Sequence, residues 1–401
     1  MAGRCAAGRR RRPPPPPPPP PGRRGGATTP PPPRRPAPAF VLDIDGVLLR
    51  GGATIRRAPD AVRLLYGAAD GAPTHPLLFL TNGGGVTEAA RAAALSDRLG
   101  VRVQASQVVL SHTPLAAMAV AEAAAAAKAA AATATAAADA SAAAAAPPTP
   151  PTSVLVIGGR GCADVAAGYG FRNVLAAADA ARVAPSVAPF SPPRRGEPLE
   201  RPDAEAVAAL PVGTVLVMHD STDWGRDIQL VVDALLAPPP PAPTHAPAVP
   251  ADAADGAQRV QVVACNADLT FPADHPAPRL ATGAFTTALA AVYAAATGGR
   301  RRLALTRLGK PHGVQYALAA GRLEAQRVAL RLPAPTPAIY AVGDNPASDV
   351  AGANGAGGVW RSVLVRAGNW GGGGAANDPV HPAHHVVDDV YDAISLGLDA
   401  H

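Results

Sequence analysis

The stretch Phe40-Val41-Leu42-Asp43-Ile44-Asp45-Gly46-Val47 decides the fold. Its first three residues form a short apolar run, typical of a buried strand, and the run ends in two acids and a glycine. The pattern recurs downstream, where apolar residues 77–80 precede a Thr-Asn-Gly loop and residues 338–342 precede a Gly-Asp pair. A helical stretch is expected over 88–99. Apolar strands that alternate with helices and end at polar or glycine residues predict an α/β fold with a doubly wound parallel sheet.

A long middle segment separates the two halves of this sheet. Further strands are expected in it at residues 153–157, 214–218 and 260–264, with low-complexity inserts between them. We interpret the segment as a second α/β unit inserted into the first and lengthened by surface loops, which cost little closure entropy. The predicted organisation is an Arg/Pro-rich extension (1–38), the first part of the sheet domain (39–114), the inserted unit with its Ala- and Pro-rich inserts (115–280), and the second part of the sheet domain (281–401).

The N-terminal extension carries the chain's excess of positive charge. Residues 1–38 hold nine arginines, no acid and an unbroken run of prolines from Pro13 to Pro21. The formal net charge is +6, but the rest of the chain has 27 basic and 30 acidic residues, so no nucleic-acid partner is expected. The composition fits a mitochondrial or plastid transit peptide, although the prolines oppose an amphipathic helix. A low-complexity extension without a targeting role is the alternative.

Two further features bear on the compartment. The alanine-rich run 116–146 favours a helix. It is interrupted by Glu122, Lys128 and Asp139, and alanine is too weakly apolar to predict a membrane span. The three cysteines are widely spaced, which excludes a disulfide framework and a Cys-x-x-Cys zinc site. We therefore expect a soluble protein without a membrane partner in a reduced intracellular compartment.

Four acids at predicted strand ends indicate a metal site. Asp43 and Asp45 are two residues apart, so an extended backbone aims both carboxylates the same way. Adjacent carboxylates repel each other unless a cation or a shared proton intervenes. Asp344 and Asp349 follow another strand and complete a set of oxygen ligands suited to Mg²⁺.

The remaining polar residues at these strand ends suit an anion. Thr81 and Asn82 offer a hydroxyl and an amide beside Gly83 to Gly85, whose N–H groups can approach a negatively charged ligand. Lys310 adds a compact positive charge. Together with the acids, this set fits attack by a carboxylate on a phosphate, a reaction that depends on charge neutralisation and in-line positioning.

Taken together, these segments resemble the four motifs of the haloacid dehalogenase superfamily. They are Asp43-Ile44-Asp45-Gly46-Val47, Leu80-Thr81-Asn82-Gly83, Gly309-Lys310-Pro311 and the run from Gly343 to Val350. The large insert between the second and third motifs resembles class IIA, which carries a C2-type α/β cap. Finer features are similar to the cat-eye-syndrome critical region type: Leu48 to Gly51, Thr81 to Gly85, Asp223 to Asp227, Asn266 to Leu269 and Gly352 to Asn354.

The resemblance implies a two-step phosphoryl transfer. Asp43 would be the nucleophile, Asp45 the general acid and base, and Lys310 the group that neutralises the nucleophile and the phosphate. Thr81, Asn82 and Gly83 would hold the phosphoryl oxygens. Mg²⁺ would rest on Asp43, the backbone carbonyl of Asp45 and Asp344, with Asp349 in support. Gly83 to Gly85 depart from the Asn-Ser of many relatives, which removes side-chain donors.

The inserted cap is expected to decide the substrate. The candidates that would face the site are His219, Asp220, Asp223, Trp224, Arg226, Asn266 and Asp268. The alternative is that they form the scaffold of the cap or a cap–cap surface in a homodimer.

The leading hypothesis is a magnesium-dependent phosphatase, located in mitochondria, that acts on a small phosphorylated metabolite. A plastid or the cytoplasm is the alternative location. The alternative function is a catalytically silent binding or scaffold protein of the same fold in an organelle. Haloacid dehalogenation is disfavoured, because Asp45 and the magnesium acids would then be superfluous.

Overall fold

The computed structural model describes residues 35–67, 71–138, 151–193, 196–238, 258–271, 275, 277–368 and 376–401. The expected transit peptide lies outside the described residues as far as Arg34, as do much of the Ala-rich insert (139–150) and of the Pro-rich insert (239–257). Arg35–His401 form one compact unit.

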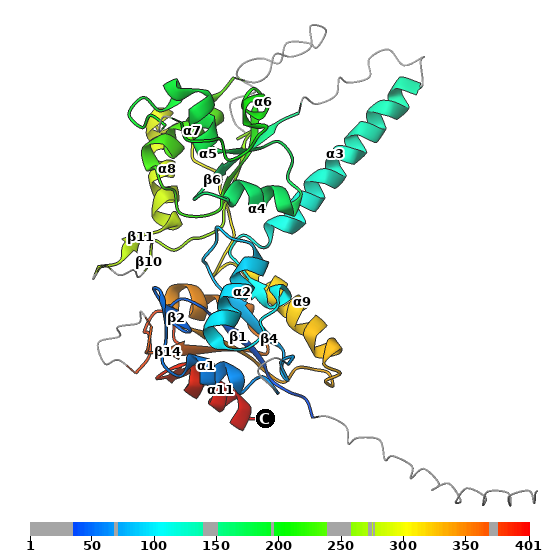
Figure 1. Ribbon diagram of the computed structural model, residues 1–401, viewed down its shortest axis with the longest axis vertical. Coiled ribbons are helices and arrows are strands. Elements are labelled where there is room, and N and C mark those ends of the chain that lie inside the picture. The colour runs from blue at the N-terminus through cyan, green and yellow to red at the C-terminus, as the bar shows by residue number, and fades with distance from the viewer. Residues whose placement is uncertain are drawn as a thin grey trace, which may run out of the picture. The chain divides into compact units, whose positions relative to one another are not determined.

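The main sheet has six parallel strands in the order β15-β14-β13-β1-β4-β5 (Figure 1). They are β1 (Ala39–Leu42), β4 (Leu77–Leu80), β5 (Val108–Val109), β13 (Ile339–Gly343), β14 (Trp360–Val365) and β15 (His385–Val387). All four residues of β1 are buried, because helices cover both faces of the sheet. The continuous apolar run of β1, without a polar alternate position, is the sequence signal of this double cover.

The side chains of β1 alternate between two hydrophobic cores. Phe40 and Leu42 point into the core beneath α1 (Ala58–Arg63), α2 (Glu88–Leu99) and α11 (Val390–Asp399). Ala39 and Val41 point into the core beneath α9 (Gly313–Ala329) and α10 (Ala351–Ala356). The doubly wound parallel sheet expected from the sequence is confirmed.

A second sheet of five parallel strands has the order β12-β9-β8-β6-β7. In the sequence, its strands come between β5 and β13 of the main sheet. Its strands are β6 (Ser153–Ile157), β7 (Val174–Ala176), β8 (Val212–Val217), β9 (Gln261–Ala264) and β12 (Thr306–Arg307). Its helices are α3 (Leu115–Ala138), α4 (Cys162–Tyr169), α5 (Ala177–Val183), α6 (Ala204–Ala208), α7 (Trp224–Leu236) and α8 (Thr282–Ala296). We call this inserted α/β unit the cap and the main sheet with its helices the core.

The cap extends further along the chain than its predicted end at residue 280. Phe285, Leu289 and Tyr293 of α8 pack in the hydrophobic cluster of the cap strands. β12 pairs in parallel with β9, Thr306 opposite Val263. Residues 281–307, which the sequence assigned to the core, therefore lie in the cap. β12 has only two residues, and both are exposed, so the sequence gave no apolar pattern from which this strand could be predicted.

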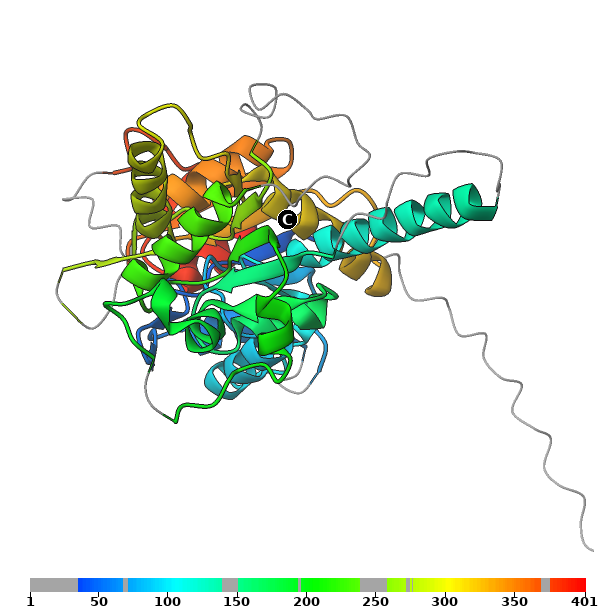
Figure 2. The same cartoon turned by 90° about the horizontal axis from the view of Figure 1, so that it is seen from above.

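Small elements complete the described chain: β2 (Leu49–Arg50) with β3 (Ala53–Thr54), β10 (Thr270–Phe271) with β11 (Arg279–Leu280), the 3₁₀ turns Ala105–Gln107 and Pro185–Val187, and a π-helical turn, Pro346–Val350. The described part of the alanine-rich run, as far as Ala138, lies in α3, as its composition favours, and α3 extends away from the sheets in Figure 2. No described helix has both the length and the apolar character that a bilayer span requires.

The sheet register brings the polar motif residues to one edge. Leu42 of β1 is opposite Val342 of β13, and the N–H of Asp43 donates to the carbonyl of Val342 at 2.9 Å. Asp43 and Asp344 therefore leave neighbouring strands side by side. Thr81 follows β4 on the other side of β1, so all three lie at the carboxyl ends of the strands, where doubly wound sheets bind ligands.

Candidate active site

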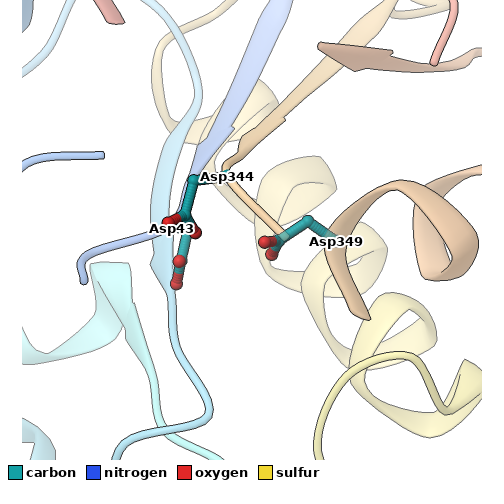
Figure 3. Close-up of side chains that lie close together, drawn as sticks. All are labelled: Asp43, Asp344 and Asp349. Carbon is teal, nitrogen blue, oxygen red and sulfur yellow. The ribbon is translucent and has the colours of Figure 1, made fainter. Parts of the chain in front are cut away.

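Three buried carboxylates converge at this edge of the sheet. Oxygens of Asp43, Asp344 and Asp349 all lie within 4.8 Å of one another. Figure 3 shows Asp43 and Asp344 next to each other and the carboxylate of Asp349 turned toward them from the π-helical turn. Their exposed fractions are 7%, 2% and 6%, so the group is almost closed to water.

Lys310 supplies the positive charge of the site. Its Nζ lies 2.7 Å from Oδ1 of Asp43 and 2.6 Å from Oδ1 of Asp349. Burial opposes its charge, but the carboxylates of Asp349 and Asp43 outweigh burial and raise the pKa of Lys310 well above its ordinary value. Burial also raises the pKa of Asp43 well above its ordinary value; Lys310 opposes that shift, while Asp349 and Asp344 add to it.

This donor set fits a divalent metal ion. Oxygens of three buried carboxylates lie within 4.8 Å of one another, and the ammonium of Lys310 contacts two of them, Asp43 and Asp349. Hard cations such as Mg²⁺ take carboxylate oxygens. The carboxylate of Asp45 is exposed and outside this group, so Asp45 has only a backbone oxygen to offer, as the resemblance implies.

Close packing around Asp344 explains a glycine of the first motif. Gly46 has φ +92°, and a Cβ built on it would lie 1.9 Å from Oδ2 of Asp344. A side chain there would displace the buried carboxylate, and an L-residue is strained at this φ.

Gly46→Ala is therefore expected to raise the Mg²⁺ concentration that gives half-maximal activity by roughly 10- to 100-fold, because it shifts a metal-site carboxylate. Metal titration of phosphate release measures the effect. Gly52→Ala is the matched control, since a Cβ at Gly52 has no atom within 4 Å. The same Mg²⁺ dependence in both variants would contradict the assignment of Asp344.

Asp45 and Thr81 lie at the open side of the site. Thr81 Oγ1 is 3.5 Å from Oδ2 of Asp45 and accepts the N–H of Gly83 at 2.9 Å. Asp45 is exposed, whereas Thr81 is 2% exposed. The structure thus places the expected acid–base residue where a leaving group and water can reach it.

The resemblance implied that Asn82 holds phosphate, but in the structure its side chain is engaged elsewhere. Its Oδ1 accepts the backbone N–H of Lys310 at 2.7 Å, and its Nδ2 donates to the Lys310 carbonyl at 3.0 Å. Nδ2 also donates to Oδ2 of Asp268 in the cap at 2.9 Å. Asn82 therefore fixes the backbone that presents the lysine and ties the core to the cap.

The glycine loop meets the cap. A Cβ on Gly84 would lie 2.9 Å from the carbonyl oxygen of Met218, and one on Gly85, whose φ is +77°, would lie 2.9 Å from the ring of His219. Because Met218 and His219, which follow β8, approach so closely, only glycine fits at positions 84 and 85.

Among the seven cap candidates, Asp223, Trp224 and Arg226 make contacts within the cap. Asp223 caps α7 by accepting the N–H of Arg226 at 3.1 Å, and Arg226 Nε pairs with Asp227 at 2.7 Å. Trp224 packs edge-on against Phe285. These contacts are the ones that the scaffold alternative expects, and contact with substrate stays a prediction.

The loop of Asn266 and Asp268 reaches the core. Asn266 Oδ1 accepts the N–H of Asp268 at 2.8 Å, and the Asp268 carboxylate accepts from Asn82. Of the neighbouring candidates, Asp220 accepts the hydroxyl of Thr282 at 2.6 Å, and His219 borders Gly85.

Sequence reasoning missed a second set of polar residues where the cap joins the core. Oε1 of Glu88 accepts the hydroxyls of Thr113 at 2.7 Å and Tyr169 at 2.6 Å, and His112 Nδ1 lies 2.8 Å from the Tyr169 oxygen. Arg91, on the same helix as Glu88, lies beside Gly83. The only sequence signal was position: His112 and Thr113 directly precede the inserted segment, and Glu88 and Arg91 follow the glycine loop.

The fully buried His112 predicts a pH effect on stability. Burial lowers its pKa from 6.5 to about 4, so between these values the unfolded chain binds the proton and the folded chain does not. The contribution of His112 is fully present above pH 6.5 and is lost as the pH falls toward 4. Between pH 7 and pH 5 we expect it to cost about 2 kcal/mol of unfolding free energy. Urea unfolding of the wild type and of His112→Asn at both pH values isolates this term; parallel losses in the two proteins would refute it.

Two parallel sheets, one inserted into the other, and a buried lysine among carboxylates define a hydrolase with a phosphatase-type fold. The family model described as haloacid dehalogenase-like hydrolase matches residues 40–172, and that described as HAD-hydrolase-like matches residues 307–393. The two matches cover more than half of the 401 residues. The chain belongs to the haloacid dehalogenase superfamily, and it carries an α/β cap inserted into its core, as the resemblance implied.

Two curated fungal relatives agree. The chain is 30% identical over 361 residues to a cardiolipin synthase (CMP-forming)/mitochondrial hydrolase fusion protein of Schizosaccharomyces pombe, across 89% of this chain and 52% of that protein. It is 29% identical over 381 residues to a mitochondrial hydrolase of Saccharomyces cerevisiae, across 90% of this chain and 95% of that protein. The chain thus spans about half the length of the fusion protein.

Solved structures share the fold. A p-nitrophenyl phosphatase from Archaeoglobus fulgidus superposes with a TM-score of 0.53 at 16% identity, over 91% of this chain and all of that one (100%). A hypothetical protein from Pyrococcus horikoshii gives 0.53 at 18% identity, over 90% and 99%. At these identities the likeness extends to the fold alone.

Proposed function

We propose that this chain is a magnesium-dependent phosphatase of small phosphorylated metabolites that works through an aspartyl-phosphate. The observation that carries the proposal is the position of Lys310, which bridges Asp43 and Asp349 beside Asp344. The ammonium of Lys310 lies against the carboxylate that would attack phosphorus, and the three clustered carboxylates offer the oxygen ligands that a divalent cation takes.

In the first step, an oxygen of Asp43 attacks phosphorus and the ester P–O bond breaks. Asp45, exposed at the open side, gives its proton to the departing alkoxide. In the second step, Asp45 takes a proton from water, the water oxygen attacks phosphorus, and the bond to Asp43 breaks to release phosphate. Lys310 neutralises charge on Asp43 throughout, and the Thr81 hydroxyl, which the N–H of Gly83 holds in place, orients a phosphoryl oxygen.

Asp43, Asp344 and Asp349 would hold the metal ion. When bound, the ion supplies neutralisation of the charge on the transferred phosphoryl group. Asn82 contributes indirectly, through the backbone of Lys310.

Phosphate release from a panel of phosphomonoesters tests the proposal. We expect turnover in Mg²⁺, loss of turnover in EDTA and recovery on adding Mg²⁺ back. Mg²⁺ binding without turnover of any ester, and without trapping of beryllium fluoride on Asp43, would refute the phosphatase and favour the silent binding protein.

We also propose a mitochondrial location, supported by the names of the two fungal relatives, both called mitochondrial hydrolases, and by the Arg-rich, acid-free composition of residues 1–38. N-terminal sequencing of the mature protein from isolated mitochondria tests it. A chain that is absent from mitochondria would contradict the proposal.

A further inference from the structure

An arginine outside the motif residues borders the open side of the site. Arg91 lies on α2, four residues after the Thr87 cap that begins this helix. Its Nη2 lies 3.7 Å from the point where a Cβ of Gly83 would stand. Oδ2 of Asp45 lies 3.7 Å from the same point, and Oγ1 of Thr81 lies 3.2 Å from it. The guanidinium, the acid–base carboxylate and the threonine hydroxyl therefore surround one glycine without a side chain.

The guanidinium of Arg91 lacks a partner within the described chain. Its Nε is buried and makes no hydrogen bond among the described residues. Glu88, one helical turn earlier, accepts instead from Thr113 and Tyr169. Arg91 as a whole is half-buried, and a guanidinium has five N–H donors, so its outer nitrogens can donate to a ligand.

Nearby arginines in the described chain do find partners. Arg98, on the same helix, donates to the carbonyl of Gly52 at 2.6 Å, and Arg63 pairs with Asp60 at 2.8 Å. Among the described residues, Asp45 and Arg91 do not form an ion pair, so Asp45 is not the partner of this guanidinium.

The side of the site on which Arg91 lies identifies its ligand. The transferred phosphoryl group belongs at Asp43 and Lys310, whereas Asp45 must contact the departing oxygen. Arg91 Nη2 and Asp45 Oδ2 each lie 3.7 Å from the Cβ position of Gly83, so Arg91 is near the carboxylate that must contact the departing oxygen. We propose that Arg91 binds a second anionic group, a carboxylate or a phosphate, on the leaving portion of the substrate. This inference rests on the proposed phosphatase and narrows its substrates to esters with two anionic groups.

The test compares two esters that differ mainly in one carboxylate, 3-phosphoglycerate and glycerol 3-phosphate; a propanediol bisphosphate serves as the phosphate arm. The readout in each arm is the kcat/KM for the ester with two anionic groups, 3-phosphoglycerate or the bisphosphate, divided by the kcat/KM for glycerol 3-phosphate. Charge-assisted hydrogen bonds lead us to expect that Arg91→Gln lowers this ratio about 10- to 100-fold. Arg98→Gln is the matched control and should leave the ratio unchanged. The arm with the larger fall tells carboxylate from phosphate.

An unchanged ratio in Arg91→Gln for both arms would overturn the inference, including the case where all esters lose activity equally through a contact with the transferred group. Calorimetric binding of the same esters to Asp43→Asn and to Asp43→Asn/Arg91→Gln separates this failure from that of the phosphatase. If Arg91 holds the second anion, the first variant binds 3-phosphoglycerate more tightly than glycerol 3-phosphate and the double variant does not. Equal binding of both esters by Asp43→Asn also refutes the inference, whether or not the wild type turns them over.

Discussion

Asp43→Asn is expected to abolish phosphate release, with kcat falling on the order of 10⁴-fold or more, as for the loss of other enzymatic nucleophiles. The amide keeps the shape of the carboxylate but cannot form an acyl-phosphate, so no slower version of the same route remains. Lys310 keeps its second partner, Asp349, at 2.6 Å. The variant also removes one of three mutually repelling buried acids, and we therefore expect no fall in the thermal midpoint of the metal-free protein.

The matched comparison is Asp45→Asn. It removes the acid–base group but spares the nucleophile, and general acid–base catalysis contributes about 10²- to 10⁴-fold. The expected order of activity is wild type, then Asp45→Asn, then Asp43→Asn, measured as phosphate release under single-turnover conditions. Trapped phosphoryl-enzyme in Asp45→Asn but not in Asp43→Asn would locate the covalent step. Equal phosphate release by Asp43→Asn and the wild type would remove the basis of the mechanism.

The core and its site were predictable because polar site residues directly follow the apolar strands in the sequence. The apolar run Phe40-Val41-Leu42 predicts burial on both faces, and parallel register then carries Asp43 to the side of Asp344. The expected helix over 88–99 coincides with α2. Two considerations were sufficient to predict this part of the chain: the local periodicity of apolar residues, and the rule that parallel sheets bind ligands at the carboxyl ends of their strands.

The parts that escaped prediction depend on contacts between distant segments. Nothing in the sequence around Asn82 shows that a loop 228 residues away would occupy its amide. The sequence from Asp223 to Asp227 indicates a polar cluster, but it does not show that Trp224 packs against Phe285 or that Asp223 caps α7. Likewise, β12 has two residues, too few for a periodic signal, and only its pairing with β9 extends the cap.

Lys310→Met is expected to lower the unfolding free energy of the metal-free protein by about 3 kcal/mol or more, because removing one partner strands buried charges. Asp43 and Asp349 are 7% and 6% exposed, and each contacts the ammonium at 2.7 Å or less. Methionine has nearly the length of lysine, so the loss reports charge and not a cavity. Urea unfolding in EDTA at neutral pH measures it. Lys128→Met, at the chain's other lysine, which is exposed, should cost under about 0.5 kcal/mol.

A double-mutant cycle separates the charge effect from general damage. In an Asp43→Asn/Asp349→Asn background the lysine has lost both carboxylate partners, so the further change Lys310→Met removes an unpaired buried ammonium and should cost little or stabilise the protein. The cycle is then strongly non-additive, and the sign of the Lys310→Met effect depends on the two acids. Additive losses across the cycle would show that Lys310 stabilises the protein through packing alone, and the carboxylate group would then have to be held by interactions other than this ammonium.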